Sequence, residues 1–196
     1  ALRHLAQDFY LAANPSDIAF VRQLHGNSDN LTDRLVTLRW LVRYEPPNLR
    51  DEVLKTFFDT WSHEALVVNQ WLSVQATRPS LDCVESVVEL SAHAAFDWQN
   101  PNKLRALVGA FASSNPIAFH RADGAGYRFL GDVVERIQST NPQVAARMLG
   151  PLTQWQRYQE GQNVMRKELE RIANIKMLPK DVREVVSRSL GASATG

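Results

Sequence analysis

The sequence predicts an all-α protein, built as an irregular α-solenoid of antiparallel helix pairs. Apolar residues recur at helical spacing in almost every segment, and no segment shows a clear alternation of apolar and polar residues. Proline and cap-forming residues divide the chain into about ten helices, most of roughly 10–15 residues, joined by short loops. Short connections favour antiparallel neighbours. A compact helical bundle is the alternative architecture, because no strict repeat of fixed length is visible.

Each expected helix is identified by its apolar stripe and by the residues that bound it. The stripes are, in chain order, Leu2/Leu5/Phe9/Tyr10, Ile18/Val21, Leu31/Leu35/Leu38/Val42, Val53/Phe57/Trp61, Ala65/Val68/Leu72, Val84/Val87/Val88, Leu104/Leu107/Val108/Phe111, Leu130/Val133/Val134/Ile137, Met165/Leu169/Ile172/Ile175 and Val182/Val185/Val186. The boundaries are Pro15-Ser16-Asp17, residues 27–30, Pro46-Pro47-Asn48, Pro79-Ser80, Asn100-Pro101, Asn115-Pro116 and Asn141-Pro142. Among them we expect Asn48 to cap the helix that follows it. The resulting superhelix would resemble armadillo or HEAT repeats.

Composition indicates one globular domain without a nucleic-acid footprint. The 196 residues are 44% hydrophobic and carry 22 Lys+Arg against 21 Asp+Glu, a net charge of +1. Cys83 is the only cysteine, so an intrachain disulfide is excluded and a reducing, cytoplasmic location is expected. We expect Cys83 to be a small core residue. No apolar run reaches the length of about 18 residues that a membrane span needs, and we expect no membrane partner.

The first ten residues, ALRHLAQDFY, lack the pattern of a signal peptide and start within an amphipathic helix. A chain that starts inside an element looks like a fragment of a longer polypeptide. We therefore expect residues 1–190 to form a helical domain, and residues 191–196 to be a flexible tail.

Motifs for metal or phosphate binding are incomplete. His63-Glu64 resembles the start of a zinc-protease HExxH motif, but the fifth position is Val67, so we interpret the pair as the polar start of a helix. The remaining histidines lack ligand spacing. Gly124-Ala125-Gly126 has neither a preceding strand nor a following Lys-Ser/Thr pair, which favours a turn that needs positive φ over a phosphate cradle. The five tryptophans are expected mainly in the core rather than on a base-stacking surface.

The stretch from His93 to Tyr127 combines buried-type aromatics with an unusual density of Asn-Pro and Asp-Gly. It predicts either a shaped surface facing a partner or cavity, or an irregular crossing between helices.

Three segments of the chain resemble the C-terminal domain of bacterial-type aminopeptidase N. The first is Asn100-Pro101-Asn102 followed by KLRALVGAFASSNPIAFHRADGAGYRFL. The second is Asn30-Leu31-Thr32-Asp33-Arg34, with leucine where the family has methionine, and the third is Asn141-Pro142-Gln143-Val144-Ala145 with Arg147 after it. The resemblance runs from about residue 16 to 190.

The resemblance implies that the parent protein is a zinc-dependent exopeptidase that removes N-terminal residues from peptides. Its zinc and catalytic groups would lie in a thermolysin-like domain of the same polypeptide, and this chain would supply neither a catalytic nor a zinc-binding residue. The chain would cap the active-site cavity and control the access of short peptides. We expect the parent to be a monomer.

The resemblance also implies which side chains line the substrate cavity, namely Arg105, Gln143 and Arg147. Gln143 and Arg147 are four residues apart and therefore share one helical face. Both arginines could instead serve the structure at helix ends or against an interdomain carboxylate. The alternative function is a free-standing helical-repeat scaffold that binds a protein or peptide along its groove. Single-stranded nucleic-acid binding is the weakest interpretation.

Overall fold

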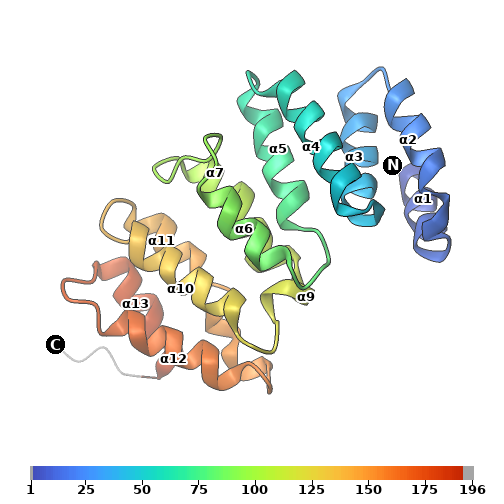
Figure 1. Cartoon of the computed structure of the whole chain (residues 1–196). Coiled ribbons are helices and arrows are strands. Elements are labelled where there is room, and N and C mark those ends of the chain that lie inside the picture. The colour runs from blue at the N-terminus through green and yellow to red at the C-terminus, as the bar shows by residue number, and fades with distance from the viewer. Residues whose placement is uncertain (1, 192–196) are drawn as a thin grey trace. The chain divides into compact units, whose positions relative to one another are not determined.

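A computed structural model describes residues 2–191 and confirms the all-α prediction (Figure 1). Helical residues make up 75% of the chain, and no strand occurs in the part that the structure describes. The chain divides into two compact units, of which the first ends at Arg78 and the second begins at Pro79. The predicted tail, 191–196, lies outside the described residues except for Gly191.

The first unit consists of five α-helices and a short 3₁₀ turn. They are α1 (Leu2–Ala13), η1 (Pro15–Asp17), α2 (Ile18–Asn27), α3 (Leu31–Tyr44), α4 (Pro47–Trp61) and α5 (Ala65–Ala76). Helix α3 is central, since it packs against α2, α4 and α5. The core where α1, α2 and α3 meet is formed by Leu11, Val21, Trp40 and Leu41.

Helix starts in this unit follow the predicted chemistry in part. The side chain of Asn30 accepts a hydrogen bond from the backbone N–H of Asp33 and so caps α3. The prediction that Asn48 caps α4 is wrong, because the helix already begins at Pro47 and Pro46 occupies the cap position without a side-chain bond. The fixed φ of proline suits the first helical turn, where the missing N–H would have had no helical partner.

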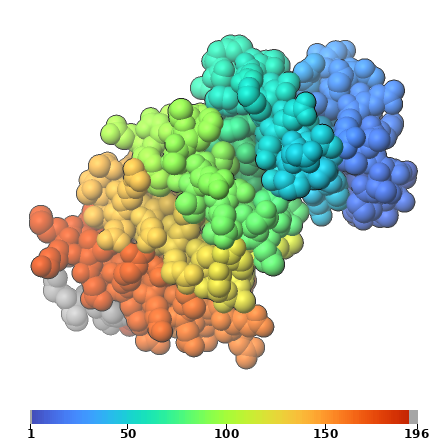
Figure 2. Space-filling model, in the orientation of Figure 1, coloured from blue at the N-terminus to red at the C-terminus, as the bar shows by residue number. Residues whose placement is uncertain are grey.

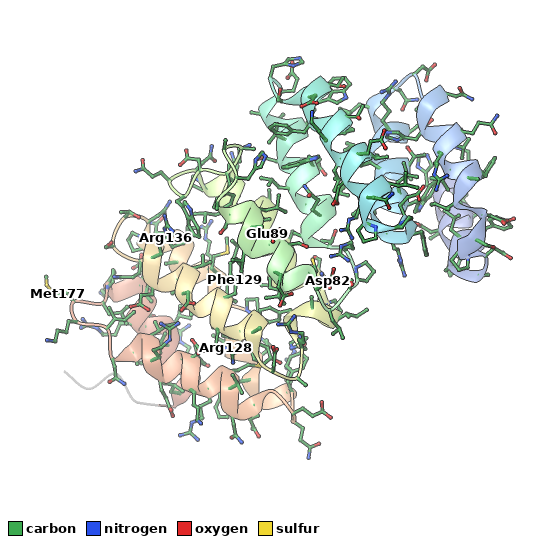
Figure 3. The ribbon with its side chains drawn as sticks, in the orientation of Figure 1. Asp82, Glu89, Arg128, Phe129, Arg136 and Met177 are labelled. Carbon is green, nitrogen blue, oxygen red and sulfur yellow. The ribbon has the colours of Figure 1, made fainter. Side chains whose placement is uncertain are left out.

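The second unit is built around α10. Its elements are α6 (Cys83–Ser91), α7 (Pro101–Leu104), the π-helical segment η2 (Arg105–Gly109), α8 (Ala110–Ser114), α9 (Pro116–Phe119), α10 (Ala125–Ile137), α11 (Pro142–Met148), the 3₁₀ segment η3 (Leu152–Arg157), α12 (Gln162–Ala173) and α13 (Lys180–Leu190). Helix α10 packs against α6, α9, α11 and α12. On α10, Phe129 (labelled in Figure 3) meets Phe111 edge to face, with ring centroids 5.8 Å apart.

A π-helical turn interrupts the helical run from Pro101 to Ser114. The N–H of Ala110 donates to the carbonyl of Arg105, five residues earlier, instead of four. The wider turn still keeps Leu104, Leu107, Val108 and Phe111 fully buried, as the predicted stripe requires. The sequence stripe gave no indication of this local geometry.

Several local predictions are confirmed. Cys83 is a fully buried core residue. Gly124 has a φ of 73° immediately before α10, as expected for the Gly-Ala-Gly turn. Glu64 occupies the cap position of α5, in agreement with the polar-start interpretation of His63-Glu64. None of the helices between residues 2 and 191 has the length and apolar character that crossing a membrane requires.

Candidate substrate-contact site

Arg147 lies on a groove of the second unit. The groove encloses about 490 Å³ and is lined by Ala112, Ser113, Pro116, Phe119, His120, Arg147, Gly150, Pro151, Gln154 and Tyr158. We call it the Arg147 groove. Helices α8 and α9 supply one side of its lining, and α11 with the segment around η3 supplies the other.

The aromatic wall of the Arg147 groove is formed by His120 and Tyr158. Their rings are stacked, with centroids 3.9 Å apart and planes inclined by 21°. On its other side, Nδ1 of His120 lies 2.9 Å from the hydroxyl oxygen of Tyr127, within hydrogen-bond distance. His120 is therefore fixed between a buried phenol and an exposed one, and its ring plane is set by both contacts.

The chain places His120 through a short and well-capped turn. Asn115 is buried, and its side chain accepts a hydrogen bond from the N–H of Ala118, which starts α9. Helix α9 ends after one turn at Phe119, so His120 follows a buried ring directly.

Gly126 lets α10 approach this turn. A Cβ at Gly126 would lie only 2.4 Å from the carbonyl oxygen of Phe119. Only glycine permits this contact without moving the backbone. Gly126 therefore allows Phe119, the residue before His120, to lie directly against α10.

The turn after His120 is held to α6 by charge. Arg121 forms ion pairs with Asp123 at 2.9 Å and with Glu85 at 2.8 Å, and also donates to the carbonyl of Leu81. The guanidinium of Arg121, together with the backbone N–H of Ala125, lowers the pKa of Asp123 to about 2. The carboxylate is thus ionised at any pH near neutrality.

The electrostatics of the Arg147 groove favour an anionic or carbonyl ligand. Burial lowers the pKa of His120, so its imidazole is neutral at pH 7. Arg147 is exposed, and within residues 2–191 its guanidinium has neither an ion-pair nor a hydrogen-bond partner. Arginine donates well to carboxylates and peptide carbonyls, while Phe119 and the stacked rings offer apolar contact beside it. The arrangement suits a ligand that combines an anionic or carbonyl group with an apolar part.

Of the three residues predicted to line the cavity, only Arg147 lines this groove. Gln143 is exposed on the same helix as Arg147, one turn earlier, and is absent from the groove lining. Arg105 donates to the carbonyl of Pro101 at 3.1 Å and to the side chain of Asn102 at 2.9 Å, both on its own helical run. Its guanidinium thus already has two partners on that run.

Sequence reasoning missed His120 and Tyr158. His120 was set aside because it lacked metal-ligand spacing, a test that cannot detect an aromatic wall. The available signal was its position directly after the Asn115-Pro116 cap, inside the stretch from 93 to 127. In that stretch the aromatics pack on one another, as the helix-crossing interpretation expects, and its edge lines the groove; a partner or cavity facing it stays a prediction.

The Asn30–Arg34 motif has a structural role in the first unit. Asp33 accepts hydrogen bonds from Arg3 at 2.7 Å and from Asn30, and its carboxylate lies 2.8 Å from Nε2 of His4. The ion pair with Arg3, followed by the bonds from Asn30 and His4, lowers the pKa of Asp33 to about 2. Arg34 donates to the carbonyl of Ser28. These contacts join α1 to the start of α3.

No cluster of three or more His, Cys, Asp or Glu side chains suited to a metal ion occurs between residues 2 and 191. His63 is exposed, stacks on Trp61, and lies 3.8 Å from Glu64. The residues described here therefore do not fit a zinc ion.

Comparison with known proteins gives one consistent relationship. A family model described as "Domain of unknown function (DUF3458_C) ARM repeats" matches residues 1–191. Aminopeptidase N of Haemophilus influenzae is 39% identical over 182 residues, which cover 92% of this chain and 21% of the relative. Aminopeptidase N of Caulobacter vibrioides is 40% identical over 184 residues, with 92% and 21% covered.

Further similarity appears in Escherichia coli aminopeptidase N and in a solved structure. The former is 38% identical over 176 residues, covering 89% of this chain and 20% of the relative. The crystal structure of Legionella pneumophila aminopeptidase A in complex with aspartic acid matches with a TM-score of 0.81 and 29% identity, covering 92% of this chain and 21% of that one. The chain thus spans about a fifth of the length of the proteins it matches.

Proposed function

Because the chain belongs to the DUF3458_C family of ARM-repeat domains and is homologous to the C-terminal region of aminopeptidase N, we propose that it is the non-catalytic C-terminal domain of such an enzyme. The parent would be a zinc metallo-aminopeptidase that removes N-terminal amino acids from peptides. Its zinc would be held by a thermolysin-like domain of the same polypeptide. This chain would cap the active-site cavity and control which peptides enter.

The observation that supports this role best is Arg147. Its guanidinium is exposed at a groove with an aromatic wall, and no described residue neutralises it. Bound peptide would accept charge-assisted hydrogen bonds from Arg147 through its carbonyls or its carboxylate. Gln143 would contribute from the same helical face. Arg105 is part of the proposed lining with a smaller contribution, because its guanidinium already bonds to its own helical run.

The test is Arg147→Ala in the full-length protein. Losing a hydrogen bond to a charged group costs about 1.5–3 kcal/mol, or about 10- to 150-fold in an equilibrium constant. We expect a higher KM for a tetrapeptide with kcat nearly unchanged, because the contact exists equally in ground and transition states. A single-residue aminoacyl anilide, too short to reach this domain, should be hydrolysed normally.

A matched control is Arg39→Ala, which removes an exposed arginine on α3 of the first unit. It should change neither substrate's KM. Equal effects of Arg147→Ala on both substrates, or a loss explained by lower thermal stability, would assign Arg147 to the structure instead. Gln143→Ala tests the neighbouring position in the same way.

The proposal includes a cytoplasmic location and a monomeric state. The location rests on the single, buried Cys83. The sequence of the parent gene distinguishes the proposed aminopeptidase from the alternative, a free-standing helical-repeat scaffold. If the proposal holds, the gene encodes an HExxH motif and a distal glutamate upstream of this chain.

A further inference from the structure

Helix α1 carries an apolar stripe that nothing in the described structure covers. Leu2, Leu5 and Phe9 are 84%, 54% and 71% exposed. Their spacing of three and four residues places them on one side of the helix. In Figure 2 the deep-blue surface of α1 lies at the margin of the first unit. The stripe has the spacing with which one helix packs on another.

The other side of α1 is fixed, so the exposure of this stripe is built into the fold. Arg3 and His4 both bind Asp33. Asp8 accepts a hydrogen bond from the indole N–H of Trp40, and Leu11 is 2% exposed in the core. Rotating α1 to bury Leu5 and Phe9 would break these contacts.

A helical-repeat stack that ends in water normally ends with a polar outer face. The outer stripe of α1 is apolar instead, with two leucines and a phenylalanine. A stripe of this kind corresponds to an internal interface between neighbouring helices. Its period also argues for a helical partner, because a strand would present side chains with a period of two.

We propose that Leu2, Leu5 and Phe9 form a joint with an amphipathic helix that precedes residue 1 in the same polypeptide. The ARM-repeat family model matches residues 1–191, and the homologous proteins are more than four times as long as this chain. The joint rests on the proposed membership in a longer polypeptide, but not on its peptidase activity. It gives α1 the role of an internal repeat helix, which transmits the position of the preceding segment to α3 through Asp33.

The test is carbene footprinting of the full-length protein. Leu66 and Met177 serve as exposed references, at 77% and 93%, and Figure 3 shows Met177 projecting away from the ribbon. We expect Leu5 and Phe9 to be labelled about fivefold less than these references after correction for intrinsic reactivity, because buried side chains keep less than about a tenth of their exposure. Labelling equal to the references overturns the joint.

A pair of variants and a dilution series separate the remaining outcomes. Leu5→Lys should open the segment before residue 1 to limited proteolysis, whereas Leu66→Lys, the matched change on α5, should not. Equal cleavage in both variants contradicts the proposal. Protection that disappears on dilution, together with a doubled mass in sedimentation, identifies a second copy as the occupant and also overturns it. If the footprint shows an exposed stripe but the full-length protein hydrolyses a tetrapeptide with normal kinetics, the joint is rejected and the proposed function still stands.

Discussion

Gly126→Ala should destabilise the chain, although glycine to alanine within a helix ordinarily stabilises it. Gly126 is the second residue of α10, where the usual gain is about 0.5–1 kcal/mol. Here the added Cβ would lie 2.4 Å from the carbonyl oxygen of Phe119 and 2.8 Å from its Cα. Both atoms belong to backbone, which cannot swing aside as a side chain can.

The expected magnitude follows from these two opposing effects. Overpacking a tight contact costs about 1–3 kcal/mol, so the net loss should be about 1–2 kcal/mol after the helix gain. The matched control is Gly109→Ala. Its Cβ would meet Met148 at 3.7 Å, an ordinary contact, and its φ of −62° is helical. This control should stabilise the chain by about 0.5–1 kcal/mol.

Urea unfolding followed by circular dichroism measures both variants against the wild-type chain. The midpoint should fall for Gly126→Ala and rise for Gly109→Ala. A Gly126→Ala midpoint equal to or above that of the wild type would refute the close approach of α10 to Phe119. Because Phe119 precedes His120, the same variant should also raise the KM of the full-length protein for a tetrapeptide.

Two further predictions concern acid stability and the buried thiol. The pKa of Asp123 falls from 3.8 to about 2 on folding, so its ion pair with Arg121 stabilises the fold above pH 3.8 and loses that effect as the pH drops through about 2. Asp123→Asn should therefore lower the urea midpoint at pH 6 and clearly less at pH 2.5, and an equal loss at both would contradict the assignment. Cys83 is fully buried, so a thiol reagent should modify it only at the rate of unfolding. Rapid stoichiometric modification of the native chain would show that α6 opens locally.

The helical architecture was predictable because it depends on local chemistry. Apolar stripes of period 3.6 and capping asparagines such as Asn30, Asn100 and Asn115 act over three or four residues, which a sequence displays directly. The prediction that Asn48 caps α4 was wrong because Pro46-Pro47 marks the same boundary. Proline suits the first helical turn, so the helix begins at Pro47, before Asn48.

The candidate site was less predictable, since it depends on contacts between distant segments. Tyr158 stacks on His120 although the two residues are 38 positions apart in the sequence. No local sequence pattern predicts that contact. Arg147 was identified through the family resemblance, and the structure adds the groove around it. The two arginines among the three predicted lining residues differ for a physical reason: Arg105 has hydrogen-bond partners within one turn, and Arg147 has none among the described residues.

The π-helical segment Arg105–Gly109 has a consequence for how this chain can vary. A π turn absorbs one residue more than an α turn, so the residues before and after it keep the orientation of a continuous α-helix. Deleting one residue there would leave Phe111 packed against Phe119 and Phe129. A deletion in the α-helical residues between Pro101 and Leu104 would rotate the following residues by about 100° and turn Phe111 out of the core. This turn is therefore the place where the helix can lose a residue during evolution at little cost to the packing behind His120.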